Sequence, residues 1–447
     1  MGTLIMVGQL ILALAILVTL HELGHFATAR WFGIKVEKFY LFFDAWGIKL
    51  FKFKRGDTEY GIGWLPLGGY VKIAGMIDES MDKEQMQAPA EDWEFRSKPA
   101  WQRLIVMLGG VTVNFFLGIL IFAGSLYYYG EKYIPNKAIV NGHGIMVEEL
   151  GIYAGLQNGD KILKVNGKEL EKFNDIYSPD VVLADRIVMD IQRNGKDTTL
   201  ILPSDFTKRF TNSRGKGFIS YRFSPVVAKV EKNTGASAGG LQKMDRILSV
   251  NDVEVKYFDE LPTVLNQYKG KKVKVVVSRK DAPVTLNIQL DTNGKMGFRP
   301  TDELDYKDQY KVVEYGLFES IPAGFNKGVN SIVTQVQAFG QMFSGKIDPR
   351  KSMMGPFQLA TVFGDQWDWQ KFWAITGLLS LVLAFMNLLP IPALDGGHVV
   401  FLIIEIIIGR PLSEKFLYYM QLLGMIILIS LMVFIFGNDI WQMFFAR

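Results

Sequence analysis

The sequence predicts a multi-pass α-helical membrane protein with β-rich segments between its helices. Four apolar stretches are each long enough to cross a bilayer, and 49% of the 447 residues are hydrophobic. A segment rich in β-branched and aromatic residues follows the first stretch, and a sequence repeat lies in the long loop between the second and the third. These observations favour a helical bundle with a small sheet and two β-rich domains in one loop.

The predicted spans cover about 3–31, 104–128, 372–393 and 416–436. A fifth apolar run, Val399 to Ile408, is too short to cross a membrane and is predicted as a short helix at membrane level. The chain is therefore divided into a first span (1–32), a β region (33–100), a second span (101–130), two β-rich domains (135–220 and 221–302), amphipathic helices (303–370), a third span (371–394), a loop with a short helix (395–415) and a fourth span (416–437).

The charges of the loops predict how the chain crosses the membrane. The loop 33–100 carries ten Lys and Arg, and the short loop 395–415 carries Arg410 and Lys415. The positive-inside rule places both loops in the cytoplasm, so the long loop 131–370 lies outside. The end of the first span and the end of the third span then meet at the same depth, near the cytoplasmic side.

The motif His21-Glu22-Leu23-Gly24-His25 lies at the cytoplasmic end of the first span. Histidines four residues apart share one helix face and can bind one zinc ion, and Glu22 is placed to activate a water molecule. An ionisable cluster at this depth is costly and indicates a functional site. A cleaved signal peptide is the alternative, but Met1–Leu20 lacks the basic residue that such peptides carry at their start.

Two histidines leave a tetrahedral zinc short of one protein ligand. The chain has 0 cysteines and 4 histidines, so the third ligand must be a histidine or a carboxylate. Asp395 follows two prolines that break the third span, and it is predicted as that ligand. The alternatives are that Asp395 only caps the following helix, or that His398 is the ligand. His143 lies in a turn outside the membrane and is not expected to bind the metal.

Two motifs together give the chain a family resemblance. His21-Glu22-Leu23-Gly24-His25, with Asn387-x-x-Pro390-x-Pro392-x-Leu394-Asp395-Gly396, resembles the site-2 proteases, zinc enzymes that cut peptide bonds within membranes. The order of segments is most similar to the RseP type, which has four spans and two PDZ domains in its outer loop.

The resemblance implies a role for each matching residue. His21, His25 and Asp395 would bind zinc, and Glu22 would be the catalytic base. Asn387 would hold the substrate backbone, although a purely structural role between helices is the alternative.

The resemblance also implies that the sheet of the β region is re-entrant and that its edge receives the unwound substrate. Strands are predicted at 36–43, 48–53 and 60–65. The edge strand follows them, and its substrate-binding residues would be Gly69, Tyr70, Val71 and Lys72. Two departures from the family pattern are Gly110-Val111-Thr112-Val113-Asn114, which lacks a proline, and Phe42-Phe43-Asp44 in the first hairpin.

The outer loop contains an internal repeat. Leu156-Gln157-Asn158-Gly159-Asp160-Lys161-Ile162-Leu163-Lys164-Val165-Asn166 recurs 85 residues later as Leu241-Gln242-Lys243-Met244-Asp245-Arg246-Ile247-Leu248-Ser249-Val250-Asn251. The repeat resembles the core of PDZ domains, which bind peptide ends by strand addition; steric exclusion of bulky substrates is the alternative role. After the repeat, apolar residues at helical spacing over 312–347 predict an amphipathic helix pair.

The leading functional hypothesis is a zinc-dependent intramembrane endopeptidase of an inner membrane. Its expected partners are the bilayer and a single-span membrane protein, such as a trimmed anti-sigma factor or a leftover signal peptide. A net charge of +4 gives no reason to expect nucleic acid. The alternatives are a PDZ scaffold with a vestigial metal site and a metal transporter, although a transporter would need ligands spread across the bilayer.

Overall fold

The computed structural model describes residues 2–66, 68–76, 89–213, 217–345, 350 and 353–444. These residues form two compact units. The first unit contains 1–130, 314–340 and 353–447, and it holds all the long apolar helices except the end of one. The second unit contains 131–313 and 341–352 and is β-rich.

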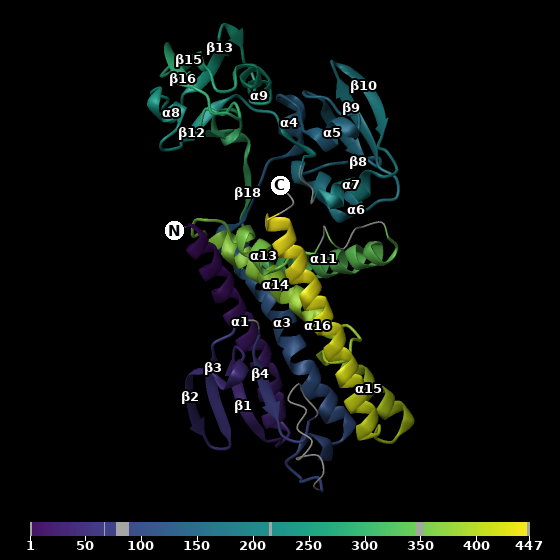
Figure 1. Cartoon of the computed structure of the whole chain (residues 1–447). Coiled ribbons are helices and arrows are strands. Elements are labelled where there is room, and N and C mark those ends of the chain that lie inside the picture. Colours follow the sequence, from purple (N-terminus) through teal and green to yellow (C-terminus); the bar gives the residue numbers. More distant parts are fainter. Residues whose placement is uncertain are drawn as a thin grey trace. The chain divides into compact units, whose positions relative to one another are not determined.

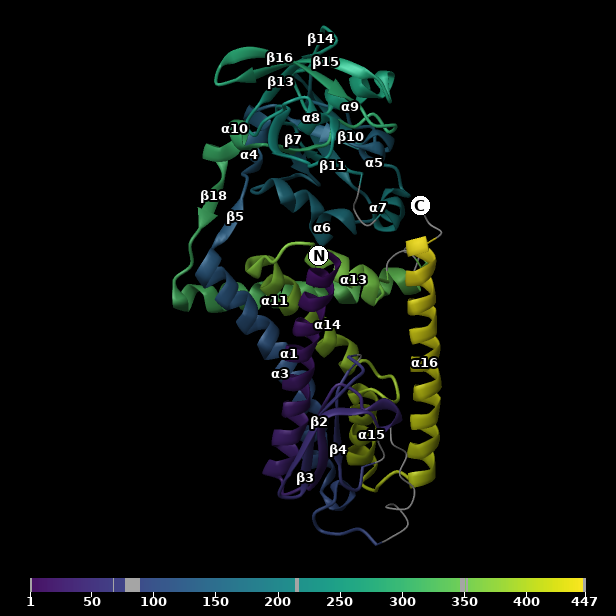
Figure 2. The ribbon, with the colours of Figure 1, turned by 60° about the vertical axis from the view of Figure 1, so that its left-hand side comes forward.

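The first unit is a helical bundle with a small sheet (Figures 1 and 2). Its helices are α1 (Gly2–Trp31), α3 (Ala100–Tyr129), α11 (Leu317–Phe343), α13 (Pro356–Phe363), α14 (Trp369–Leu388), α15 (Asp395–Ile408) and α16 (Glu414–Phe444). Four of them, α1, α3, α14 and α16, are long and apolar enough to cross a membrane, as the sequence predicts. The predicted short helix is α15, with 14 residues.

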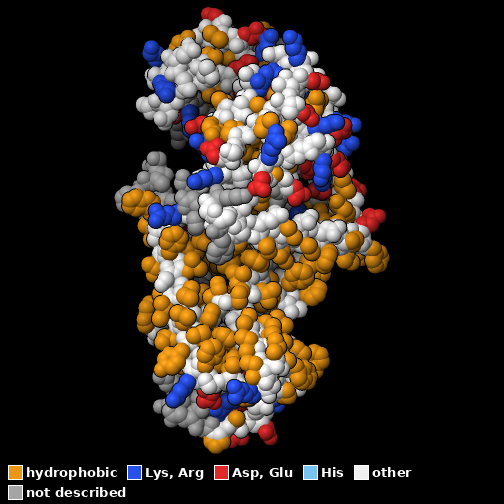
Figure 3. Space-filling model, turned by 90° about the vertical axis from the view of Figure 1, so that its right-hand side faces the viewer, with side chains coloured by type: hydrophobic (Ala, Val, Ile, Leu, Met, Phe, Trp, Pro, Cys, Tyr) orange, Lys and Arg blue, Asp and Glu red, His pale blue; other side chains and the backbone are white. Residues whose placement is uncertain are grey.

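Helix α3 lies at the centre of this bundle and packs against α1, α14 and α15. Glycines allow its closest approach to α1: a Cβ on Gly24 would lie 2.4 Å from the carbonyl oxygen of Gly109. Of the four long apolar helices, α16 packs least against the rest of the protein. In its most apolar 18-residue stretch, 11% of the residues are buried, against 44% in that of α3. Apolar side chains cover the outer surface of the long helices in Figure 3, as expected for a surface that faces lipid.

The predicted β region is a four-stranded sheet. Its strands are β1 (Val36–Leu41), β2 (Lys49–Arg55), β3 (Thr58–Gly63) and β4 (Tyr70–Ile73), in the order β2-β3-β1-β4. Strand β4 runs antiparallel to β1, with Phe39 opposite Val71, and it forms one edge of the sheet. Among the described residues, no strand pairs with the other side of β4, so this side can pair with an extended peptide.

A polar network fixes the position of this edge strand. The hydroxyl of Tyr70 donates to Asp44 at 3.0 Å, and its ring stacks on that of Tyr40. Lys49 and Tyr40 both donate to Glu59, at 2.8 and 2.6 Å. The hydrogen bond from Lys49 and then that from Tyr40 lower the pKa of Glu59 to about 2, so the network stays charged at neutral pH.

The apolar runs predicted as an amphipathic helix pair form one continuous helix, α11. Its proline, Pro322, lies in the second turn, so it removes only one backbone hydrogen bond near the start of the helix. Two glycines in the middle bring α11 against α3 instead of ending it. A Cβ on Gly324 would lie 2.6 Å from the backbone of Ala123, and one on Gly328 would lie 3.0 Å from Ile119.

The second unit contains the two predicted β-rich domains. The first has strands β6 (Ile145–Val147), β7 (Lys161–Val165), β8 (Lys168–Glu169), β9 (Val188–Arg193), β10 (Lys196–Ile201) and β11 (Ile219–Tyr221), with helices α4 (Asn136–Asn141), α5 (Glu149–Tyr153), α6 (Pro179–Val182) and α7 (Phe206–Asn212). The second has β12 (Val226–Val230), β13 (Arg246–Val250), β14 (Val253–Glu254), β15 (Lys272–Arg279), β16 (Ala282–Gln289) and β17 (Phe298–Thr301), with α8 (Gly235–Ala238) and α9 (Glu260–Leu265). Each domain has its own apolar core.

The internal repeat places one buried aspartate, hydrogen-bonded to an arginine, in each PDZ-like domain. In the first domain, the buried Asp160 accepts two hydrogen bonds from Arg193, at 2.8 and 2.7 Å. In the second, the buried Asp245 accepts two from Arg279 at the same distances. The repeated aspartate thus anchors the strand that follows it, because a buried carboxylate needs a charged partner.

Residues 303–313 belong to the segment predicted as amphipathic helices, but they pack on the first β-rich domain. Helix α10 (Glu303–Tyr306) places Tyr306, 2% exposed, in that domain's core. Strand β18 (Lys311–Val313) then pairs with β5 (Glu131–Tyr133), the strand through which the chain enters the unit. The two ends of the β-rich unit are therefore joined as a two-stranded stem.

Candidate metal centre

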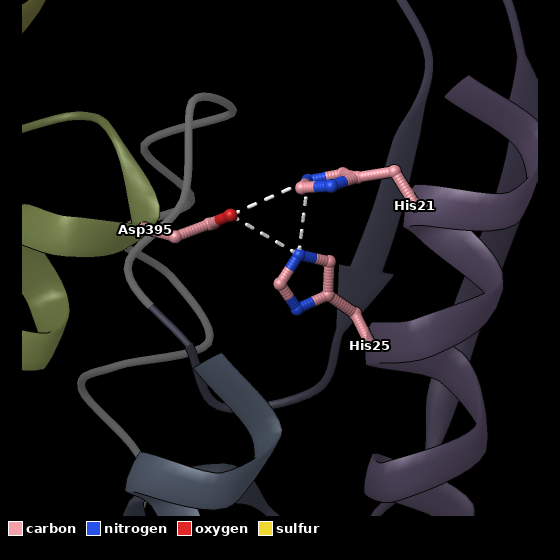
Figure 4. A group of neighbouring side chains, drawn as sticks. All are labelled: His21, His25 and Asp395. Atoms are coloured by element: carbon pink, nitrogen blue, oxygen red, sulfur yellow. Dashed lines mark hydrogen bonds and ion pairs between the residues drawn. The ribbon is translucent and has the colours of Figure 1, made fainter. Parts of the chain in front are cut away.

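Helix α1 supplies the first two groups of the site. His21 and His25 lie one turn apart on the same helix face and are 7% and 6% exposed. Their Nε2 atoms are 3.2 Å apart, and both rings point away from the helix toward the same neighbour (Figure 4). The spacing of the motif therefore produces a shared pair of nitrogen donors.

The third group comes from the far end of the sequence. Helix α14 ends at Leu388, the chain turns through Pro390 and Pro392, and α15 begins at Asp395. Only glycine fits at position 396, because a Cβ there would lie 2.3 Å from the carbonyl oxygen of Leu389. This tight turn aims the Asp395 carboxylate at the two histidines (Figure 4).

The three donor atoms have the geometry of a zinc site. Oδ2 of Asp395 lies 3.3 Å from Nε2 of His21 and 3.3 Å from Nε2 of His25. In a tetrahedral site with zinc–ligand bonds of about 2.0–2.1 Å, ligand atoms lie roughly 3.3–3.4 Å apart. The triangle therefore matches one face of such a tetrahedron, and the fourth position remains for water or substrate.

Hydrogen bonds behind the histidines favour metal binding. Nδ1 of His25 lies 2.9 Å from the carbonyl oxygen of Val106, an acceptor only, so Nδ1 carries the proton and Nε2 keeps its lone pair. Nδ1 of His21 lies 3.2 Å from the side-chain amide of Asn114, whose Oδ1 is buried without a hydrogen-bond partner among the described residues. Exchanging the amide's nitrogen and oxygen would let Oδ1 accept from His21 in the same way.

A cavity of about 580 Å³ opens onto these groups. Glu22 and Asn387 line it, and Nδ2 of Asn387 lies 3.3 Å from Nε2 of His21. Gly69 and the edge strand, Tyr70–Ile73, line it as well. Gly69 has no room for a side chain, since a Cβ would lie 2.7 Å from both Val18 and the backbone of Tyr40. The structure thus gathers all the predicted site residues around one cavity.

The other two histidines lie outside the group of ligands. His398 lines the cavity but is not part of the cluster of three possible metal ligands found among the described residues. His143 belongs to the β-rich unit, where its Nε2 lies 3.7 Å from Asp305. The structure therefore gives no support to either histidine as a ligand.

Comparison with known proteins identifies the family. The model of peptidase family M50 matches residues 9–431. The chain belongs to peptidase family M50. Its similarity to named relatives extends over nearly the whole length of the chain. The chain is 28% identical to a presumed zinc metalloprotease of Neisseria meningitidis, over 97% of this chain and 98% of the relative. It is also 28% identical to the regulator of sigma E protease of Haemophilus influenzae, with the same coverage, and to the regulator of sigma-E protease RseP of Escherichia coli, over 97% of each chain.

This M50 chain is thus a membrane protein and a metalloprotease, and the resemblance to site-2 proteases of the RseP type is confirmed. The scaffold alternative is not favoured. Sequence reasoning assigned no role to Asn114 or Gly110, although both stand in the motif compared with the family. Gly110 leaves space for the histidines, because a Cβ there would lie 2.4 Å from Nε2 of His25.

Proposed function

We propose that this protein is a zinc-dependent intramembrane endopeptidase that cuts single-span membrane proteins. The observation that carries the proposal is the triangle of donor atoms from His21, His25 and Asp395, formed between the ends of membrane-length helices. A bound zinc ion would polarise the scissile carbonyl and make water more acidic. The donor set of two imidazoles and one carboxylate suits zinc better than calcium or magnesium, which prefer oxygen ligands.

Glu22 is the proposed general base. Its carboxylate lines the same cavity and is not part of the cluster of possible ligands, so it is free to accept a proton. It would take a proton from the attacking water and deliver it to the nitrogen of the departing amine. The Asn387 amide, close to His21, would donate to the substrate backbone beside the scissile bond.

The edge strand β4 is the proposed docking strand. A membrane helix must unwind before its peptide bond becomes accessible, and its freed N–H and C=O groups then need partners. Gly69 and residues Tyr70 to Lys72 of β4 line the cavity, and among the described residues β4 pairs only with β1. Pairing with β4 would satisfy one edge of the unwound segment.

The proposed orientation places 33–100 on the cytoplasmic side of an inner membrane and 131–313 outside. The ten Lys and Arg of 33–100 support this assignment. The metal centre lies at the end of α1 that leads into 33–100, so cleavage is proposed near the cytoplasmic side. Candidate substrates are single-span anti-sigma factors and signal-peptide remnants; the name of the Escherichia coli relative, a regulator of sigma-E protease, supports the first of these.

The position of the cut tests both the activity and the orientation. Purified native protein in liposomes should cut a single-span substrate inside its span, in the half nearer the cytoplasm, since the metal centre lies at that level. Mass spectrometry of the fragments gives the position of the cut, and the Glu22→Gln protein is the control for contaminating proteases. Cuts confined to the flanking loops would contradict intramembrane cleavage, and cuts in the outer half would contradict the orientation.

We propose that the two PDZ-like domains restrict substrate size. The structure suggests a clean deletion of 134–310 that joins Tyr133 to Lys311 through a short Gly-Ser turn. This change keeps the β5–β18 stem and removes Tyr306 together with the core that buries it. The deleted protein should cut a trimmed substrate at a rate near the native one and should also cut an untrimmed substrate that the native protein leaves intact.

Both substrates should be compared by immunoblot at matched expression. A third protein, in which an unrelated compact domain of similar size replaces 134–310, should again reject the untrimmed substrate. If the domains instead recruit the substrate through its new end, the deletion should slow cleavage of the trimmed substrate, and the unrelated domain should not restore it.

A further inference from the structure

The last span contributes one polar side chain to the catalytic cavity. Between Tyr419 and Asn438, the only polar side chains of α16 are those of Gln421 and Ser430. Ser430 is exposed, whereas Gln421 is 3% exposed and lines the cavity that contains Glu22 and Asp395. An amide buried in an apolar helix is costly unless it is bonded, so it indicates a function.

The carboxamide of Gln421 has no hydrogen-bond partner in the part of the chain that the structure describes. If the Gln421 side chain served to hydrogen-bond α16 to another helix, it would have such a partner. The amide therefore brings an unused donor and an unused acceptor to the wall of the cavity. A peptide group has the same two requirements, with the donor and the acceptor exchanged.

The backbone around Gln421 is packed so that the side chain faces the cavity. One turn further along α16, a Cβ on Gly424 would lie 1.9 Å from the carbonyl oxygen of Pro392. This contact brings α16 against the turn that ends at Asp395, in which Ala393 has a left-handed φ of 75°. Because the turn carries a metal ligand, the contact fixes Gln421 at the level of the metal centre.

An extended substrate needs partners along both of its edges. Strand β4 can pair with one edge, and the groups of the other edge remain to be satisfied in a place with little water. Residues Tyr70 to Ile73 of β4 and Gln421 of α16 line the same cavity, so both can reach a segment bound in it. We propose that the Gln421 amide binds a peptide group on the substrate edge that faces away from β4, and so helps to hold the unwound segment.

This inference rests on the proposed function, and kinetics test it. Gln421→Leu keeps the size of the side chain and removes both hydrogen-bonding groups. It should raise KM for a single-span substrate about 3- to 10-fold, the effect of one lost hydrogen bond, with a smaller change in kcat and unchanged zinc content. Ser430→Leu, the same kind of change at the exposed position, should leave KM and kcat unchanged.

Substrates in which single backbone amides are replaced by esters identify the contact. With the native protein, esters should weaken binding at alternate positions, since alternate N–H groups of an extended segment point to one edge. One of these effects should disappear in Gln421→Leu, and those that report pairing with β4 should persist. An unchanged KM in Gln421→Leu, or ester effects identical to those of the native protein, would overturn the role of Gln421.

A binding measurement separates this inference from the proposed function. In the Glu22→Gln background, Gln421→Leu should weaken substrate binding by the same 3- to 10-fold, since cleavage is absent. If the native protein neither cuts nor binds single-span substrates, the proposed function itself fails. If the native protein cuts them and Gln421→Leu cuts them with native KM, only the inference about Gln421 fails.

Discussion

Glu22→Gln should abolish proteolysis and leave the metal in place. The carboxylate lines the cavity beside the three possible ligands but is not one of them, so its loss removes a proton acceptor and no metal bond. Removing a general base typically lowers the rate by about 10²–10⁴-fold. Glutamine has nearly the same shape as glutamate, so the packing of α1 against its neighbours should be preserved.

The measurement combines single-turnover cleavage of a single-span substrate with zinc analysis of the same preparation. We expect about one zinc per chain in both proteins, as one tetrahedral site would bind. Substantial cleavage by the variant would contradict the role of Glu22 as base. Loss of zinc from the variant would instead show that Glu22 is a ligand.

Asp395→Ala should lose both the metal and the activity, whereas His398→Ala should retain both. Asp395 provides the only oxygen of the donor triangle, and its Oδ2 is buried without a hydrogen-bond partner among the described residues, which suits it for binding a cation. Mutating residues that only support zinc ligands typically costs 10–100-fold in metal affinity, so the loss of a ligand should cost more than about 100-fold. His398 lines the cavity but is not part of the triangle.

Zinc titration of the two variants, purified in parallel, decides between the two candidate ligands. The circular dichroism of both variants should match that of the native protein, which would show that neither variant is misfolded. Retention of native zinc affinity by Asp395→Ala, together with its loss in His398→Ala, would exchange their roles.

Sequence periodicity was sufficient to predict the elements that the site needs. The apolar lengths predicted the four spans α1, α3, α14 and α16, because a span must match the thickness of the bilayer, although α14 ends five residues earlier and α16 ends eight residues later than predicted. The i, i+4 spacing of His21 and His25 and the prolines before Asp395 predicted the donors that the structure brings together. These features are local, so a local pattern reveals them.

The features that were missed depend on contacts between distant residues. Nothing in the local pattern of 303–313 indicates that Tyr306 completes a domain that begins before residue 140. Likewise, the glycines of α11 look like helix breakers until α3 is seen to pack on them, as Gly324 does against Ala123. Gln421 was missed because a single glutamine in an apolar helix gives no periodic signal.

The stem formed by β5 and β18 has an evolutionary consequence. The two ends of 131–313 pair side by side. Removing or enlarging the part between them therefore need not alter the distance between the segments that flank 131–313. The repeated aspartate–arginine pair, with Asp160 in one domain and Asp245 in the other, is what a duplication within this part of the gene would leave. Lineages could therefore gain, lose or multiply these modules while the membrane bundle and its chemistry stayed under separate selection.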